Sequence, residues 1–227
     1  MDLKDRTTVV TGAANGIGAA LARRFHAAGA RVVVADRDET NLRAIESALN
    51  DLRPGSVHAV VADVSTEAGN VALIEAARGA FGFIDLFFAN AGVAMGTDLA
   101  TTDESTWETV MDINLHAHRW AAKHLMEEWL AAGEGYFCST ASAAGLLSQI
   151  GSATYSVSKH AAVAFAEWLA ITYGDRGLRV TCLCPQGVNT NMLNPPGAGD
   201  GIEKRKVDDR DRWLAGMRKL QARVVGG

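Results

Sequence analysis

Two patterns of apolar and polar residues alternate along the chain: short apolar runs, and longer segments in which apolar residues recur at helical spacing. Short apolar runs rich in valine and phenylalanine recur along it, and each is too short for a typical helix, which favours strands buried in a parallel sheet. These runs span residues 7–11, 31–35, 57–62, 85–89, 136–139 and 179–183. Between them the apolar residues follow helical spacing, over residues 17–28, 40–49, 68–79, 104–130 and 153–173. The pattern therefore predicts repeated strand and helix units.

Such repeats predict an α/β fold, with a doubly wound parallel sheet of the Rossmann type. Right-handed crossovers give the strand order 3-2-1-4-5-6. A chain of 227 residues suits one well-buried core, so we expect residues 1–227 to form a single domain. Ligands of such sheets bind beyond the carboxyl ends of the strands, where the winding reverses, and the candidate residues below fall at those ends.

The overall composition excludes several classes of partner. The formal net charge is −4 and the basic residues are scattered until the tail, so the chain shows no electrostatic footprint for nucleic acid. The charged N-terminus runs directly into a strand pattern, and no run of roughly 18 uncharged apolar residues occurs. We therefore expect a cytoplasmic protein without a membrane partner, which acts on a small soluble molecule.

The cysteines give no sign of a metal site. Cys138, Cys182 and Cys184 lie in predicted interior strands and lack a zinc-like spacing with histidine. We expect them to be buried small apolar side chains, and we expect no bound metal.

A glycine-rich turn lies between the first predicted strand and the first predicted helix. Gly12, Gly16 and Gly18 would let the backbone turn tightly and approach a pyrophosphate at the positive end of the helix. The spacing differs from G-x-G-x-x-G, and a tight turn without a ligand is the alternative.

Asp36 ends the second predicted strand, about twenty residues beyond the glycine turn. At that place an acid accepts hydrogen bonds from the adenosine ribose hydroxyls and repels a 2′-phosphate, which favours NAD over NADP. Arg37 follows directly, and its guanidinium is either a partner for a 2′-phosphate or a solvated surface charge.

A tyrosine and a lysine stand four residues apart in the last long helical segment, and a serine stands thirteen residues before the tyrosine. Tyr155 and Lys159 therefore lie on one helix face, about one turn apart. An ammonium beside a phenol stabilises the phenolate, so the group predicts hydride transfer between a nicotinamide cofactor and an alcohol or carbonyl compound. Ser139 is the alternative to Ser142, but Ser139 lies nearer the strand interior.

These residues resemble the short-chain dehydrogenase/reductase family, in order from the first strand to about Met192. The matching pieces are residues 11–18, Asp63, Val64, Asn90, Ala91, Gly92, Asn114, Ser142, Tyr155, Lys159 and residues 185–190. The resemblance implies a homodimer or homotetramer that pairs through the long helices. The cofactor-binding residues that it implies, together with the glycine turn and Asp36, are Gly12, Asn15, Gly16, Ile17, Gly18, Asp36, Arg37, Asp63, Val64, Asn90, Ala91, Gly92, Tyr155, Lys159, Pro185, Gly187, Val188 and Thr190.

The resemblance implies specific cofactor contacts after the third and fourth strands. Asp63 would bond the adenine amino group and Val64 would add a backbone contact, whereas the alternative for Asp63 is a helix cap. Asn90 would anchor the loop beneath the cofactor, and a purely structural role in that loop is the alternative.

The family's mechanism implies four catalytic residues. Tyr155 would be the general acid/base, which donates a proton to a carbonyl oxygen during reduction and removes one from an alcohol during oxidation. Lys159 would hold the nicotinamide ribose hydroxyls, and Ser142 would bond the substrate oxygen. Asn114 would position a water that links Lys159 to solvent, and an ordinary buried amide that caps local backbone is the alternative.

Two segments depart from the family pattern. The turn after the sixth strand has Gln186 where the family has glycine, although the Val188 backbone and the Thr190 hydroxyl would still bond the nicotinamide carboxamide. Residues 192–203 predict a mobile substrate loop and residues 203–223 predict a helix, but no seventh-strand pattern is visible. Either the strand is missing from this protein, or the sequence lacks residues between positions 202 and 203.

We therefore expect an NAD-dependent enzyme that interconverts a secondary alcohol and a ketone or aldehyde. The alternative is a catalytically silent dinucleotide-binding protein that regulates a partner, since the fold does not dictate the function. The intact Tyr155 and Lys159 favour the enzyme. A fairly hydrophobic substrate is expected from apolar residues near the pocket, namely Met95, Leu146, Leu147, Ile150, Met192 and Leu193.

Overall fold

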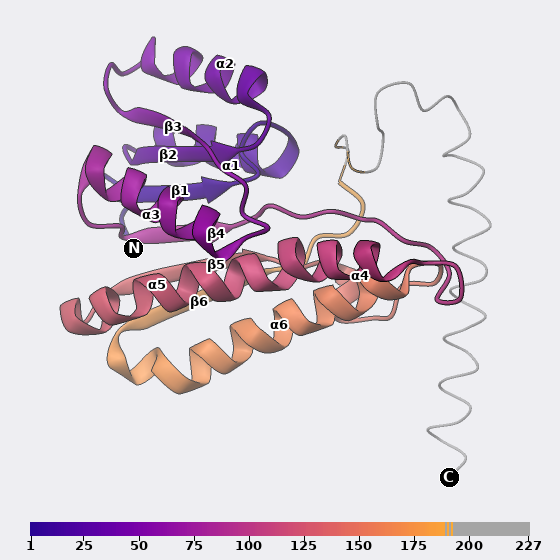
Figure 1. Cartoon of the computed structure of the whole chain (residues 1–227). Helices are drawn as coiled ribbons and strands as arrows, with labels where there is room; N and C mark the ends of the chain where they lie inside the picture. Colours follow the sequence, from indigo (N-terminus) through magenta and orange to yellow (C-terminus); the bar gives the residue numbers. More distant parts are fainter. Residues whose placement is uncertain (189, 191, 193–227) are drawn as a thin grey trace.

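The computed structural model describes residues 1–188, 190 and 192, and a single parallel sheet forms its centre. The strands are β1 (Thr7–Thr11), β2 (Arg31–Asp36), β3 (Val57–Val61), β4 (Leu86–Ala89), β5 (Gly135–Thr140) and β6 (Leu178–Leu183). Their order is β3-β2-β1-β4-β5-β6, and every neighbouring pair is parallel. The sheet in Figure 1 therefore confirms the predicted fold class and strand order.

Helices connect the strands and cover both faces of the sheet. The α-helices are α1 (Gly16–Ala27), α2 (Glu39–Asn50), α3 (Glu67–Phe81), α4 (Glu104–Met111), α5 (Ala117–Ala132) and α6 (Ala153–Tyr173). Three shorter elements are η1 (Asp112–His116), η2 (Ala143–Gly145) and η3 (Gly174–Arg176). Apart from Met192, the predicted substrate loop and the predicted C-terminal helix lie outside the described residues.

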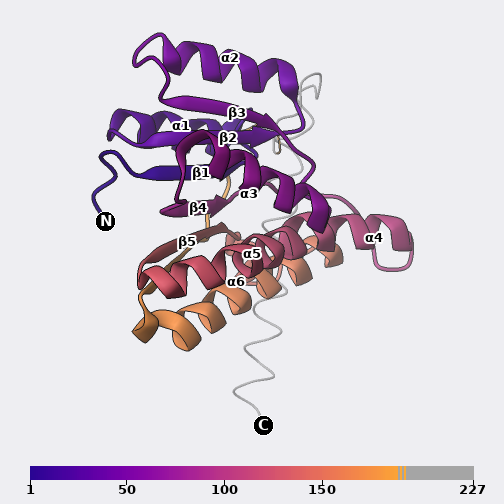
Figure 2. The same ribbon diagram turned by 60° about the vertical axis from the view of Figure 1, so that its left-hand side comes forward.

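The two faces of the sheet have separate cores, because successive side chains of a strand point to opposite faces. Val9, Val33 and Phe87 lie in register and pack in the core that α3, α5 and α6 cover. Val10 and Phe88 point the other way, into the core that α1 and α2 cover. Helices α5 and α6 run beside each other (Figures 1 and 2).

The helix predicted over residues 104–130 is interrupted, and that prediction is corrected. Helix α4 is followed directly by one wide turn of π-helix, η1, and then by α5, without a break in the helical chain. Asn114 lies in the wide turn, and its side chain makes two hydrogen bonds with the backbone of Val93. A π-turn commonly marks a functional site, and here it coincides with the residue whose amide ties the helix to the loop after β4.

Side chains cap several of the helices that follow the carboxyl ends of the strands. Asp38 accepts a hydrogen bond from the backbone of α2, Thr66 from α3 and Ser152 from α6. The N-cap residue of α1, Asn15, makes no such side-chain bond. None of the described helices combines the length and the apolar character needed to cross a membrane.

Candidate active site

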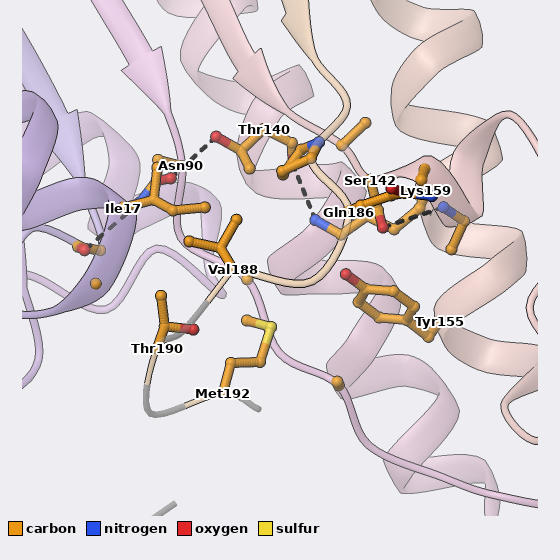
Figure 3. A pocket seen from close by; sticks show the side chains of 18 of the residues that line it. Ile17, Asn90, Thr140, Ser142, Tyr155, Lys159, Gln186, Val188, Thr190 and Met192 are labelled. Atoms are coloured by element: carbon orange, nitrogen blue, oxygen red, sulfur yellow. Dashed lines mark hydrogen bonds between the residues drawn. The ribbon is translucent and has the colours of Figure 1, made fainter. Parts of the chain in front are cut away.

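A cavity of about 500 Å³ opens at the carboxyl ends of the strands. Of the predicted residues, those that line it are Gly12, Asn15, Gly16, Ile17, Asp36, Asn90, Ala91, Gly92, Ser142, Tyr155, Lys159, Pro185, Gly187, Val188 and Thr190. Figure 3 shows Ser142, Tyr155 and Lys159 at one end of this pocket, with Ile17, Val188 and Thr190 at the other. The predicted residues that do not line the cavity are Gly18, Arg37, Asp63, Val64 and Asn114.

The glycine turn requires residues without side chains, for reasons of space and of backbone angle. Gly12 and Gly16 have φ values of +65° and +53°, in the left-handed region that favours glycine. A Cβ atom on Gly12 would lie 2.9 Å from the Cα atom of Ala91, and one on Gly18 would lie 2.1 Å from the Gly12 carbonyl oxygen. The turn therefore exposes backbone to the cavity at the N-terminus of α1, which suits an anion.

Asp36 lines the cavity beside the glycine turn. Its carboxylate accepts hydrogen bonds from the backbone N–H groups of Ala14, at 3.0 Å, and Asp38, at 3.1 Å. The same side chain thus fixes the glycine turn and presents its remaining acceptor capacity to the cavity. Arg37 is exposed beside it and does not line the cavity.

Asp63 lies near this end without reaching the cavity. The backbone N–H of Ser65 donates to its carboxylate at 3.0 Å. Hydrogen bonding by Ser65 lowers the pKa of Asp63, and the Arg37 charge acts in the same direction. Thr66, not Asp63, is the N-cap of α3, so the helix-cap alternative for Asp63 is wrong.

Asn90 joins three strands beneath the cavity. Its backbone N–H donates to the Thr11 hydroxyl at 2.9 Å, and its side-chain amide donates to the Thr11 carbonyl at 3.0 Å. The Thr140 hydroxyl donates to the Asn90 side-chain oxygen at 2.9 Å. Thr11 and Thr140 were not among the predicted site residues. Thr11 ends the first predicted strand and Thr140 directly follows the fifth, and that position at the carboxyl edge of the sheet was the available signal.

Ser142, Tyr155 and Lys159 meet at the other end of the cavity. The Ser142 hydroxyl accepts from the Ala144 N–H at 3.1 Å, which orients it at the start of η2. The Lys159 ammonium lies 5.7 Å from the centre of the Tyr155 ring and donates to the Thr140 carbonyl at 2.9 Å. Ser139 is fully buried and does not line the cavity, which leaves Ser142 as the serine of this site.

Lys159 is a buried cation, with only 2% of its surface exposed. Burial lowers the pKa of Lys159 to about 8, although the thiols of Cys182 and Cys184 act in the opposite direction. His118, on α5, is also buried, and burial followed by the Lys159 charge lowers its pKa to about 3. Near pH 7 the histidine is therefore neutral and adds no second positive charge to this region.

Asn114 supports the site from below. Its side-chain oxygen accepts from the Val93 N–H at 2.9 Å, and its side-chain nitrogen donates to the Val93 carbonyl at 2.9 Å and to the Ser158 hydroxyl at 3.0 Å. A Cβ atom on Gly92 would lie 3.2 Å from the Asn114 oxygen and 3.3 Å from the Lys159 nitrogen. Gly92 therefore leaves room for an amide and an ammonium to converge.

The sequence profile of the short chain dehydrogenase family matches residues 6–200. This chain belongs to that family. One relative is 3beta-hydroxysteroid dehydrogenase 2 from Eggerthella lenta, which is 32% identical over 226 residues that cover 99% of this chain and 82% of the relative. The chain is therefore an oxidoreductase of the short chain dehydrogenase family.

Two solved structures of similar chains have the same fold. A short chain dehydrogenase/reductase from Burkholderia phymatum in complex with NAD has a TM-score of 0.82 and 30% identity, and the match covers 89% of this chain and 73% of that one. A structure from Beutenbergia cavernae, described as a gluconate 5-dehydrogenase with NADP bound at low occupancy, has a TM-score of 0.81 and 31% identity. That match covers 89% of this chain and 80% of the other.

The turn after β6 is where this short chain dehydrogenase departs from the family pattern. The Pro185 carbonyl accepts from the Ala143 N–H at 2.9 Å, which fixes the turn to the serine segment. Gln186 is exposed and lines the cavity, so the side chain that replaces glycine faces the pocket. At the other end of this segment Thr190 approaches the glycine turn, since a Cβ atom on Gly16 would lie 3.0 Å from its methyl group.

The apolar residues expected near the pocket divide into two groups. Leu147 and Met192 line the cavity, with Ala94 and Ala144 nearby. Met95, Leu146 and Ile150 are exposed but do not line it, so that expectation is corrected for these three. Leu193 lies outside the described residues.

Proposed function

We propose that this short chain dehydrogenase interconverts a secondary alcohol and a ketone or aldehyde, with NAD(H) as its cofactor. One observation supports this above all others: Ser142, Tyr155 and Lys159 come together at one end of a cavity whose other end is a glycine-lined helix N-terminus. A regulatory protein that only binds a dinucleotide would need the glycine turn but not the acid/base group. The arrangement therefore favours the enzyme.

The residues at the adenosine end fit a dinucleotide. Gly12 brings bare backbone to the cavity, and the start of α1 has no side-chain cap, so backbone N–H groups are free to bind a pyrophosphate. Asp36 would accept hydrogen bonds from the adenosine ribose and disfavour a 2′-phosphate, which supports NAD. When the dinucleotide is bound, its nicotinamide ring would supply or accept the hydride. Asp63 and Val64 would contact the adenine, and the backbone of Val188 and the Thr190 hydroxyl would bond the carboxamide.

Tyr155 would move the proton that accompanies the hydride. In the reducing direction its hydroxyl donates to the carbonyl oxygen of the substrate, and in the oxidising direction its phenolate removes the alcohol proton. The Lys159 ammonium stabilises the phenolate in a site of low polarity. Ser142 would donate a hydrogen bond to the same substrate oxygen and stabilise the charge that develops there.

Asn114 would support Lys159 rather than touch the substrate. Its amide is bonded to Val93 and Ser158, and both hydrogens of its nitrogen have partners. The amide therefore fixes the loop after β4 against α6, and a water held nearby would connect Lys159 to solvent. Direct chemistry at Asn114 is not needed for the proposed reaction.

The substrate would be a fairly hydrophobic small molecule. Leu147 and Met192 contribute apolar side chains to the lining of the cavity. The Eggerthella lenta relative is named as a steroid dehydrogenase, which supports an apolar secondary alcohol as the substrate class. The Gln186 side chain adds one polar group that could bond a second oxygen or nitrogen of the substrate.

Self-association through the long helices is part of the same proposal. Trp168 and Ile171 on α6 are 53% and 86% exposed, and large apolar side chains on one helix suit a contact between copies. A homodimer or homotetramer is the expected state. Sedimentation of the purified chain would measure it, and a monomer at all concentrations would contradict it.

The change of Tyr155 to phenylalanine tests the reaction. Tyr155→Phe should lower kcat about a thousandfold because the proton donor is lost, while the dissociation constant for NADH should stay close to that of the wild type. Turnover of secondary alcohols would be followed by NADH absorbance, and binding by cofactor fluorescence.

Tyr136→Phe is the matched control for this test. Tyr136 lies on β5, and its hydroxyl bonds Thr181 at 2.8 Å on the surface, outside the cavity lining. This variant should keep full turnover. If Tyr155→Phe also keeps full turnover, the acid/base assignment is wrong.

A further inference from the structure

Two cysteines form a close pair next to the catalytic end of the cavity. Cys182 is in β6 and Cys184 lies just beyond its end, and their Sγ atoms are 3.9 Å apart. Both are only half-buried free thiols, which corrects the expectation that they are buried side chains of interior strands. We propose that this pair is a modification site, which a hydroperoxide converts to a disulfide, and that the disulfide displaces Ser142 and slows turnover.

The two thiols share one side of the chain. Alternate residues of an extended strand point to the same face, so Cys182 and Cys184 face one another across Leu183. The Ser139 hydroxyl donates to the Cys182 sulfur at 3.5 Å. Cys138, the third cysteine, is buried in the core under α1 and α2, on the opposite face of the sheet. It therefore cannot join the pair.

The surroundings of the pair connect it to the site. Burial and the neighbouring Cys182 raise the pKa of Cys184, whereas the Ser142 backbone N–H and the Lys159 ammonium favour its thiolate. Both thiols in turn raise the pKa of Lys159. The sulfur atoms therefore lie within electrostatic reach of the lysine that supports the catalytic tyrosine.

Two backbone hydrogen bonds couple the cysteine segment to Ser142. The Ala141 N–H donates to the Leu183 carbonyl at 2.8 Å, and the Ala143 N–H donates to the Pro185 carbonyl at 2.9 Å. Ser142 lies between the two donors, and Cys184 lies between the two acceptors. Movement of the backbone on either side of Cys184 is therefore transmitted to both neighbours of Ser142.

A disulfide would move that backbone. In an extended chain the Cα atoms of residues two apart are separated by about 6.6 Å, whereas disulfides most often join Cα atoms about 5.5–6 Å apart. The chain at Leu183 would therefore contract, and the Leu183 carbonyl would turn away from Ala141. In the described sheet β6 is an edge strand, so its outer side has no ladder there to resist the change.

The oxidation needs one hydroperoxide for each pair. One thiolate attacks the terminal oxygen of the hydroperoxide, the O–O bond breaks, and that sulfur becomes a sulfenic acid while an alcohol or water leaves. The second thiol attacks the sulfenic sulfur, an S–S bond forms, and water leaves with the remaining proton. Two thiols lose their hydrogens, the peroxide is reduced, and a dithiol reductant reverses the change.

Mass spectrometry and kinetics on the purified full chain test the proposal. After treatment with hydrogen peroxide, trypsin should release residues 180–204 as one peptide, because no lysine or arginine lies between Arg179 and Lys204. That peptide should be lighter by two hydrogen atoms and should return to its original mass with dithiothreitol. With the disulfide formed, kcat should fall about ten- to hundredfold, as expected for a misplaced catalytic group, while NADH binding persists.

Substitutions of single cysteines distinguish the effect of a Cys182–Cys184 disulfide from the effect of oxidation elsewhere in the protein. Cys182→Ser and Cys184→Ser should each keep their turnover in hydrogen peroxide, whereas Cys138→Ser should lose it as the wild type does. Absence of the disulfide in wild-type protein would overturn the proposal, as would a disulfide that leaves kcat unchanged or protection by Cys138→Ser. The mass measurement does not depend on turnover, so it tests the disulfide even if the proposed reaction is wrong.

Discussion

The two halves of the sheet contribute to the cavity in different ways. In the half formed by β1, β2 and β3 the cavity lining includes Gly12 and Gly16, which have no side chains, and Asp36 is fixed by two backbone N–H groups. In the half formed by β4, β5 and β6 side chains bond to one another and to backbone, through Asn90, Asn114 and Lys159. The glycine turn of the first half has no space for side-chain atoms, whereas the second half depends on hydrogen bonds between particular buried polar groups.

This difference has an energetic counterpart. Glycine has no side chain to desolvate, so the glycine turn packs tightly against Ala91 without burying a polar side-chain group that needs a hydrogen-bond partner. The buried Lys159 charge is unfavourable, because burial disfavours the ionised form. The half formed by β4, β5 and β6 therefore carries a destabilising group, which has a role in the proposed reaction, and stability measurements should detect it.

The largest effect concerns Lys159 and pH. Its pKa falls from 10.5 to about 8 on folding because of burial, so between these two values the unfolded chain binds more protons than the folded chain. The free energy of unfolding of the cofactor-free protein should therefore rise as the pH is raised from 8 to 10.5. The rise attributable to this lysine should be on the order of 3 kcal/mol, and it is absent below pH 8.

Denaturation in urea across this pH range would measure the effect as a difference between variants. Lys159→Met removes the titrating group, so the stability of the variant relative to the wild type should fall as the pH rises. Lys4→Met, which removes an exposed lysine, is the control and should follow the wild type. A parallel pH dependence of the wild type and Lys159→Met would show that the lysine is not destabilised by burial.

A methyl group added to the glycine turn should have the next largest effect. In Gly18→Ala the new Cβ atom would lie 2.1 Å from the Gly12 carbonyl oxygen and 2.7 Å from the Asn90 amide nitrogen, so α1 must shift. We expect a loss of about 2 kcal/mol in the free energy of unfolding, together with weaker NADH binding. Urea denaturation and cofactor fluorescence would measure the two effects.

Gly79→Ala is the matched control in another helix. Gly79 lies within α3, and a Cβ atom there meets no other atom within 4 Å. Alanine is the better helix former, so this change should stabilise the protein by about 0.5–1 kcal/mol. If both variants are stabilised, the close approach of α1 to the glycine turn does not constrain the fold.

The comparison of the two halves also explains how much the sequence could predict. The strand order was predicted, and the ends of all six strands were predicted to within one residue, because valine-rich runs separated by helical spacing leave few alternatives. The π-turn at residues 112–116 was missed. Within this turn Asn114 pairs with Val93, a contact across 21 residues that no local periodicity records.

Site residues that belong to a local sequence motif could be predicted, whereas residues whose role depends on tertiary contacts could not. Gly12 and Asp36 follow from strand ends and spacing, and both line the cavity. Thr140 and Ser158 were missed because their roles depend on Asn90 and Asn114, which approach from distant parts of the chain. The predicted burial of Cys182 and Cys184 was wrong for a related reason, since β6 lies at the edge of the described sheet, which no local pattern records.

The smallest effect concerns the cofactor preference of the first half. In Asp36→Asn one oxygen remains to accept a backbone N–H, but the negative charge that disfavours a 2′-phosphate is lost. NADH should bind about tenfold more weakly and NADPH more tightly, because a hydrogen bond to a charged group contributes about 1.5–3 kcal/mol. Titration of cofactor fluorescence with each cofactor would measure both. Asp38→Asn is the control, since asparagine caps α2 equally well and Asp38 lies outside the cavity lining. A wild-type preference for NADPH would instead assign the dominant role to Arg37.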